Sequence, residues 1–150
     1  MLIGLLFVAL TVNREITAAE AHLGGLARQA LYGLVSVFVL SLVVLIPDQS
    51  NSALGAELIA GALLNLGLAI PRQLRRMKAT VPSERMGSAL RIAIYDGAAL
   101  LITAAGVILA ADADVDSAFY LLAAAAIAYT LLAIANSWSL TFVGAGRADL

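Results

Sequence analysis

The chain carries few side chains suited to chemistry, and three of them interrupt long apolar runs. Asp96 lies well inside one such run, while Glu57 and Asn65 interrupt another. Residues four and eight apart share one face of a helix, so Glu57, Gly61 and Asn65 would form a single stripe. An acid inside such a run predicts either a site that binds a proton or cation, or a hydrogen bond that joins two helices.

Other kinds of site find no support in the residue content. The chain has no cysteine and one histidine, which excludes disulfides, thiolate nucleophiles and metal sites built from several histidines or cysteines. The sequence contains no nucleotide-binding loop, no GxSxG motif and no HExxH motif. We therefore predict no enzyme activity, no catalytic residue, no metal and no cofactor.

The remaining polar residues of interest are interpreted as solvated surface groups. Asp112, Asp114 and Asp116 alternate as in part of a calcium-binding loop, and such a turn could hold a divalent cation weakly. The glycine and the glutamate that a calcium loop needs do not follow, so these acids are expected to be hydrated charges. His22, which lies near Glu20, is interpreted in the same way.

Composition points to a membrane protein. Of the 150 residues, 62% are apolar and only 13% are charged, whereas a soluble domain has about 45–50% and about 25%. A soluble fold of this length could not cover its surface with so few charges, but a lipid-facing surface removes that need. The apolar runs are long and do not alternate as the strands of a membrane barrel do, so we predict an all-α membrane helix bundle.

Five helices are expected, in one transmembrane domain over residues 1–150, at about 1–21, 26–46, 53–71, 88–111 and 117–143. The first apolar run, 1–12, reaches only about 18 Å of the ~30 Å that a helix must cross. Either this helix starts partway into the bilayer or the natural chain begins upstream. The pair Gly24–Gly25 predicts a helix stop, Pro71 predicts a helix end, and Asn51 or Ser52 is expected to cap the third helix.

The basic residues are partitioned along the chain. If five helices cross alternately, all of them fall on one side: Arg14, Arg28, Arg72, Arg75, Arg76, Lys78, Arg85, Arg91 and Arg147. Short basic loops stay in the cytoplasm, so we predict five crossings with the N-terminus outside and the C-terminus inside. Four crossings behind an N-terminal cytoplasmic leader are the alternative. The basic residues of segment 72–91 are expected to contact anionic lipid headgroups, not nucleic acid.

Asp96 and Asn65 are expected at similar depths on neighbouring antiparallel helices. With the fourth helix near 89–109, Asp96 lies about 4–5 Å from its centre, where an ionised carboxylate costs ~2.5–3.5 kcal/mol. It should therefore be protonated, paired or facing a wet cavity. We hypothesise a polar layer that pairs Asp96 with Asn65; Arg91, about 140° round the same helix, is a poorer partner. Glu57 lies nearer the outer interface and is expected to reach it.

The stretch GLLFVALTVN, from Gly4 to Asn13, resembles a stretch of uncharacterised small bacterial multi-spanning membrane proteins. In those proteins it closes a full first helix, and a basic turn and a second helix follow. That second helix ends in a proline-containing polar loop, as at residues 47–50 here. The resemblance implies a bacterial origin and a membrane-helical fold, and it implies no activity.

The sequence is compatible with two functions. The first is a structural or accessory subunit of the bacterial inner membrane, whose partners are the lipid bilayer and either copies of itself or a larger complex. Small residues on the helices favour such close packing: Gly61, Gly67, Gly97, Gly106 and the alanines at 123–126. The alternative is a proton- or ion-linked channel or transporter that uses Asp96.

Overall fold

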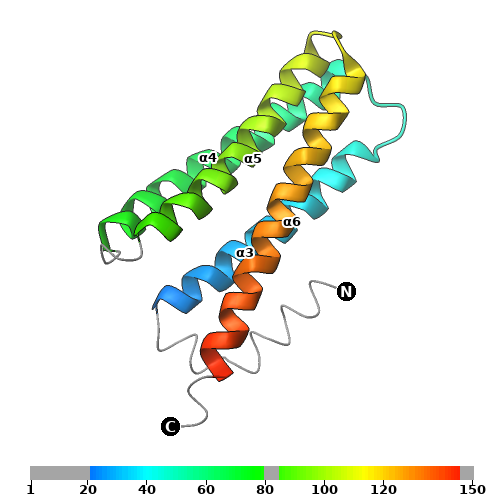
Figure 1. Ribbon diagram of the computed structural model, residues 1–150. Coiled ribbons are helices and arrows are strands. Elements are labelled where there is room, and N and C mark those ends of the chain that lie inside the picture. Colours follow the sequence, from blue (N-terminus) through cyan, green and yellow to red (C-terminus); the bar gives the residue numbers. More distant parts are fainter. Residues whose placement is uncertain (1–20, 80–84, 146–150) are drawn as a thin grey trace. The chain divides into compact units, whose positions relative to one another are not determined.

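The computed structural model describes residues 21–79 and 85–145, and within these ranges the regular structure is entirely helical (Figure 1). The helices are α3 (Ala21–Val44), α4 (Asn51–Ala79), α5 (Arg85–Ala110) and α6 (Val115–Ala145). The expected first helix at 1–21 lies outside the described residues except for Ala21, which belongs to α3. The stretch from Gly4 to Asn13 also lies outside them.

All four described helices are long and apolar enough to cross a membrane. The candidate spans are Ala27–Val44, Asn51–Arg75, Arg85–Ala110 and Val115–Ser139. A helix needs about 20 residues to cross the hydrocarbon core. The chain is therefore a multi-pass helical membrane protein, as its composition predicts.

Side-chain burial supports the same conclusion. The buried face of α5 consists mostly of small residues, among them Ala98, Ala99 and Ala105, whereas Leu90 and Leu100 are more than half exposed. A soluble interior would bury the larger apolar side chains instead. Small residues between helices and large ones on the outside are typical of a protein that faces lipid.

Two of the helices begin at a capping side chain just before their first residue. The Ser50 hydroxyl accepts a hydrogen bond from the backbone N–H of Ala53, so Ser50 caps α4, and the expected cap at Asn51 or Ser52 is wrong. The Asp114 carboxylate accepts hydrogen bonds from the backbone N–H and the hydroxyl of Ser117, and so caps α6. These caps satisfy amide groups that have no partner within the helix.

Two expected helix ends are also wrong. The backbone of α3 runs through Gly24 and Gly25, and α4 runs through Pro71 to Ala79. Proline has a φ that suits a helix and removes one hydrogen bond, while the other bonds of α4 keep the helix continuous. At Pro71, which lies within a candidate span, the local signal was outweighed by the hydrogen bonding of a long helix in a medium that offers the backbone no water.

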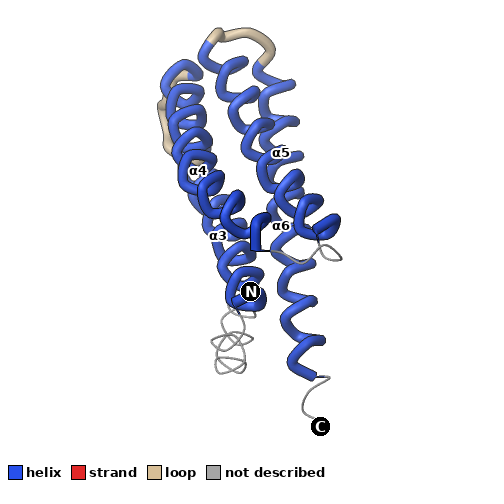
Figure 2. The backbone as a smooth tube through the Cα atoms, turned by 90° about the vertical axis from the view of Figure 1, so that its left-hand side faces the viewer, coloured by secondary structure: helices blue, strands red, loops and turns tan. Residues whose placement is uncertain are grey.

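The described chain divides into two compact units. One comprises residues 39–129, which contain the end of α3, all of α4 and α5, and the first half of α6. The other contains the described residues up to Phe38 and from Thr130 onward, where Ala30 and Leu34 of α3 form an apolar cluster with Ala133 of α6. Figure 2 shows the turns of unit 39–129 that join α3 to α4 and α5 to α6.

Within unit 39–129, α4 and α5 form an antiparallel pair (Figure 1). A Cβ built on Gly55 would lie 2.5 Å from the carbonyl oxygen of Gly106, so the two backbones touch there. A Cβ on Gly61 would meet nothing within 4 Å. The close approach of α4 to α5 therefore depends on Gly55 and Gly106, and not on the stripe through Gly61.

Candidate functional site

Asp96 lies almost at the middle of its membrane span. It is the twelfth of 26 residues in Arg85–Ala110, which places it about 2 Å from the midpoint of the span. Its Oδ1 accepts a hydrogen bond of 2.9 Å from Nε2 of Gln73, which is the third residue from the end of the α4 span. A half-buried carboxylate at mid-span is thus held by a neutral donor on the neighbouring helix.

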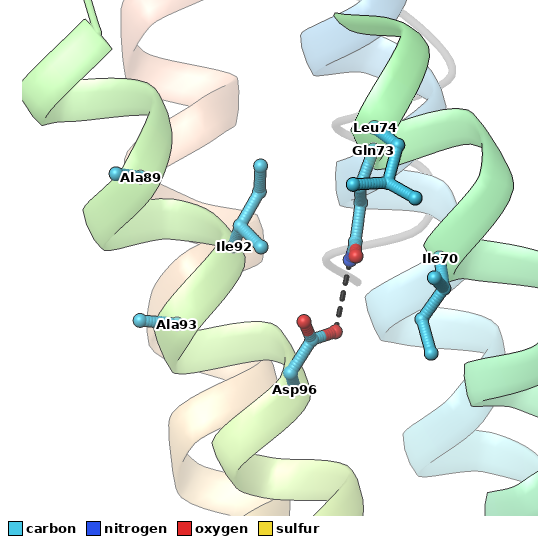
Figure 3. A pocket seen from close by; sticks show the side chains of 7 residues that line it. All are labelled: Ile70, Gln73, Leu74, Ala89, Ile92, Ala93 and Asp96. Carbon is cyan, nitrogen blue, oxygen red and sulfur yellow. Dashed lines mark hydrogen bonds between the residues drawn. The ribbon is translucent and has the colours of Figure 1, made fainter. Parts of the chain in front are cut away.

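Helix direction explains how two residues at different depths meet. Side chains on a helix lean toward the N-terminus of their own helix. Because α4 ends where α5 begins, Gln73 leans toward the middle of the α4 span while Asp96 leans toward the start of α5. The two side chains therefore point toward each other across the space between the helices, as Figure 3 shows.

A cavity of about 330 Å³ surrounds this hydrogen bond (Figure 3). Its lining comprises two polar residues, Gln73 and Asp96, and five apolar ones: Ile70, Leu74, Ala89, Ile92 and Ala93. The cavity lies toward the end of the pair opposite the Gly55–Gly106 contact, where no described residue of α4 from Gly67 to Arg75 is buried. The helices touch at one end and leave a hollow toward the other, and Asp96 opens into that hollow.

The two oxygens of Asp96 have different surroundings. Oδ1 is held by Gln73, whereas Oδ2 has no hydrogen-bond partner among the residues that the structure describes. A carboxylate that only joined two helices would gain most by engaging both oxygens in a packed, dry contact. Here one oxygen remains available to a proton or to a cation in the cavity.

Asn65 belongs to a second polar contact beside the first. Its Oδ1 accepts a 2.8 Å hydrogen bond from the hydroxyl of Tyr95, and the donor to Asp96 is Gln73. The Tyr95 ring packs edge-on against the ring of Tyr129 from α6, with ring centres 5.1 Å apart. Tyr129 is 1% exposed, and its hydroxyl has no hydrogen-bond partner within the described chain. Polar groups of α4, α5 and α6 thus gather near mid-span.

The other predicted residues lie apart from this cluster. Glu57 is exposed in the first half of the α4 span. The basic residues gather where α4 ends and α5 begins: Arg72, Arg75 and Arg85 are exposed and Arg91 is half-buried, while Arg76 and Lys78 belong to the last turn of α4 with side chains outside the described set. The acidic turn containing Asp112 lies at the opposite end of the pair, where Asp112 accepts a 2.9 Å hydrogen bond from Asn51.

Sequence reasoning missed Gln73 and Tyr95 as members of the cluster, and it missed Asn136. Gln73 lies beyond Pro71, where the helix was expected to end, and it was not considered as a partner for Asp96. Tyr95 directly precedes Asp96, a signal that could have drawn attention to it. Asn136 is fully buried in α6, and neither of its amide atoms has a partner among the described residues.

Comparisons with protein-family models, with curated proteins and with solved structures find no match to this chain. The described residues offer a carboxylate near the middle of a candidate membrane span, a neutral amide that orients it, and a mainly apolar cavity that both side chains line.

Proposed function

We propose that the protein binds and releases a proton or another cation at Asp96 and takes part in cation-linked transport across the membrane. The observation that carries the proposal is the position of the carboxylate: it lies near mid-span, with one oxygen bound to Gln73, and it lines a cavity. Acids within membrane spans that face a cavity commonly belong to ion or proton pathways.

Energetics support this choice over a purely structural contact. Placing a carboxylate near the bilayer centre costs ~2.5–3.5 kcal/mol, whereas one polar contact between membrane helices returns only about 0.6–2 kcal/mol. A neutral acceptor in place of Asp96 could also take a hydrogen bond from Gln73 and join α4 to α5, at a lower cost of insertion into the membrane. Retaining an acid beside a cavity is therefore better explained by a group that must change its charge or its ligand.

The test is flux into sealed vesicles that contain the purified full-length chain. The wild type is expected to pass protons or a monovalent cation, and Asp96→Asn is expected to abolish that flux. Glu57→Gln is the matched control, because it also neutralises an acid in a membrane span, but one outside the cavity. Absence of flux in the wild type, or equal flux in Asp96→Asn, would refute the proposal.

A second candidate is a structural or accessory membrane subunit. It is favoured by glycines that leave open space on the helices: a Cβ on Gly61, Gly67 or Gly97 would meet nothing within 4 Å. Such positions allow a helix of another subunit to approach closely. A wild type without flux that remains a defined oligomer in mild detergent would favour this second candidate.

For its placement we propose a bacterial inner membrane, five crossings, an outside N-terminus and an inside C-terminus. The charge partition supports this orientation: basic residues gather where α4 ends, and acidic residues gather in the turns before α4 and α6. The chain contains no cysteine, so single-cysteine variants report position cleanly. In intact cells an impermeant maleimide should label Ser50→Cys and spare Val81→Cys; the reverse pattern would contradict the orientation.

A further inference from the structure

The lining of the cavity at Asp96 indicates which cation it suits. Inorganic cations such as Ca²⁺ require six to eight oxygen ligands and Mg²⁺ requires six. The cavity offers the carboxylate of Asp96 and the amide oxygen of Gln73, and its other lining residues contribute apolar surface. No group of three or more acids or histidines that could hold a metal occurs among the described residues. This lining is too poor in oxygen for a hard metal ion.

We propose that the cavity binds an organic ammonium cation with hydrophobic substituents, a substrate class that rests on the transport function proposed above. The positive nitrogen pairs with Oδ2 of Asp96, and the substituents lie against Ile70, Leu74 and Ile92. The volume of about 330 Å³ falls at the lower end of the ~300–1,000 Å³ typical of small-molecule sites. Mainly apolar walls with a few placed polar groups are also typical of such sites.

The surrounding charges are compatible with a cationic ligand. Arg72 adjoins Gln73 and Arg91 adjoins Ile92 in the sequence, but neither arginine lines the cavity. Arg91 lies five residues before Asp96, about 140° round the helix. Arg72, Arg75 and Arg85 are exposed where α4 ends and α5 begins, where water and anionic headgroups screen them. Asp96 is the charged group that the cavity itself presents.

Binding of tetrapropylammonium to the full-length chain in phosphatidylcholine nanodiscs tests the proposal by titration calorimetry, with empty nanodiscs as the blank and sodium chloride as the inorganic comparison. The wild type is expected to bind tetrapropylammonium and to show no saturable binding of sodium. Asp96→Asn should weaken binding by at least about tenfold, because it removes the charge that pairs with the ligand.

A second variant separates binding from misfolding. Ile92→Phe enlarges a side chain that lines the cavity and keeps the carboxylate, so it should weaken tetrapropylammonium binding without changing the charge of the site. Ile94→Phe is its matched control: the same substitution two residues away, at an exposed residue outside the lining. It should bind like the wild type, as should Glu57→Gln.

The outcomes distinguish the substrate class from the function beneath it. If flux depends on Asp96 but tetrapropylammonium does not bind, the proposed substrate class is refuted and the proposal of cation-linked transport is retained. Binding that survives both Asp96→Asn and Ile92→Phe would place the ligand elsewhere and overturn the assigned site. If the wild type shows neither binding nor flux, both proposals are refuted.

Discussion

Replacing Gly55 by alanine is expected to destabilise the α4–α5 pair. A Cβ at residue 55 would lie 2.5 Å from the carbonyl oxygen of Gly106 and 2.6 Å from the backbone nitrogen of Ala110. Both are backbone atoms, so a rotamer change cannot relieve the contact and one helix must move. The reciprocal contact is also too close for a side chain: a Cβ on Gly106 would lie 2.8 Å from the carbonyl oxygen of Gly55.

The expected magnitude combines two opposing effects. Forcing an extra methyl group into a close-packed contact costs about 1–3 kcal/mol. Alanine is also a better helix former than glycine by roughly 0.5–1 kcal/mol. The net loss in the free energy of unfolding for Gly55→Ala is therefore about 0.5–2 kcal/mol.

Gly61→Ala is the matched control on the same helix. A Cβ there meets nothing within 4 Å, so the variant keeps the gain in helix propensity without the clash. The difference between the two variants isolates the clash, at about 1–3 kcal/mol. It can be measured by titrating the protein in mixed micelles with sodium dodecyl sulfate and following helix content by circular dichroism. A Gly55→Ala protein as stable as Gly61→Ala would refute the close contact of the backbones.

Two further predictions concern α6. Asn136→Leu, which keeps the number and branching of heavy atoms, should raise the free energy of unfolding by about 1 kcal/mol, because a buried amide without partners costs about 1–3 kcal/mol; a clear loss in the same titration would mean that the amide has a partner. Hydrogen bonds from the Ser117 hydroxyl and N–H hold the pKa of Asp114 below its ordinary value. Since the folded pKa is the lower one, this stabilisation is complete above the unfolded pKa of about 3.9 and is lost as pH falls through the folded pKa. Asp114→Ala should therefore lower the melting temperature at about pH 6 and have less effect at about pH 2; an equal effect at both would contradict the cap.

Local patterns predicted the helices better than their ends. Each of the four described helices was expected from a long apolar run, because length and hydropathy are properties of a single segment. The ends were misjudged at Gly24–Gly25, where turn signals are statistical, and at Pro71, where a continuous helix in lipid satisfies more backbone groups. Ser50 was passed over as a cap in favour of its neighbours for the same reason: several adjacent polar residues suit the role equally.

The candidate site was also predicted only in part. Asp96 was singled out from the sequence because an acid inside an apolar run is costly wherever it faces. Its position near the middle of the candidate span follows from counting residues along the helix. The prediction that Asn65 pairs with Asp96 was wrong. Gln73 and Asn65 both lie on α4, and the depth estimated by counting residues favoured Asn65. The structure pairs Asn65 with Tyr95, since the lean of the side chains brings Gln73 to Asp96.

By itself, the sequence determined that this chain belongs in a membrane, that its charges are partitioned along the chain, and that one acid lies deep within a span. These follow from the transfer cost of each segment, which depends on composition and order alone. Only the tertiary structure decided that Gly55, and not Gly61, brings α4 against α5, and that a cavity opens beside Asp96. Those features depend on how each helix is rotated and where the two cross, and several rotations satisfy the same apolar pattern when nearly every face of a helix can meet lipid.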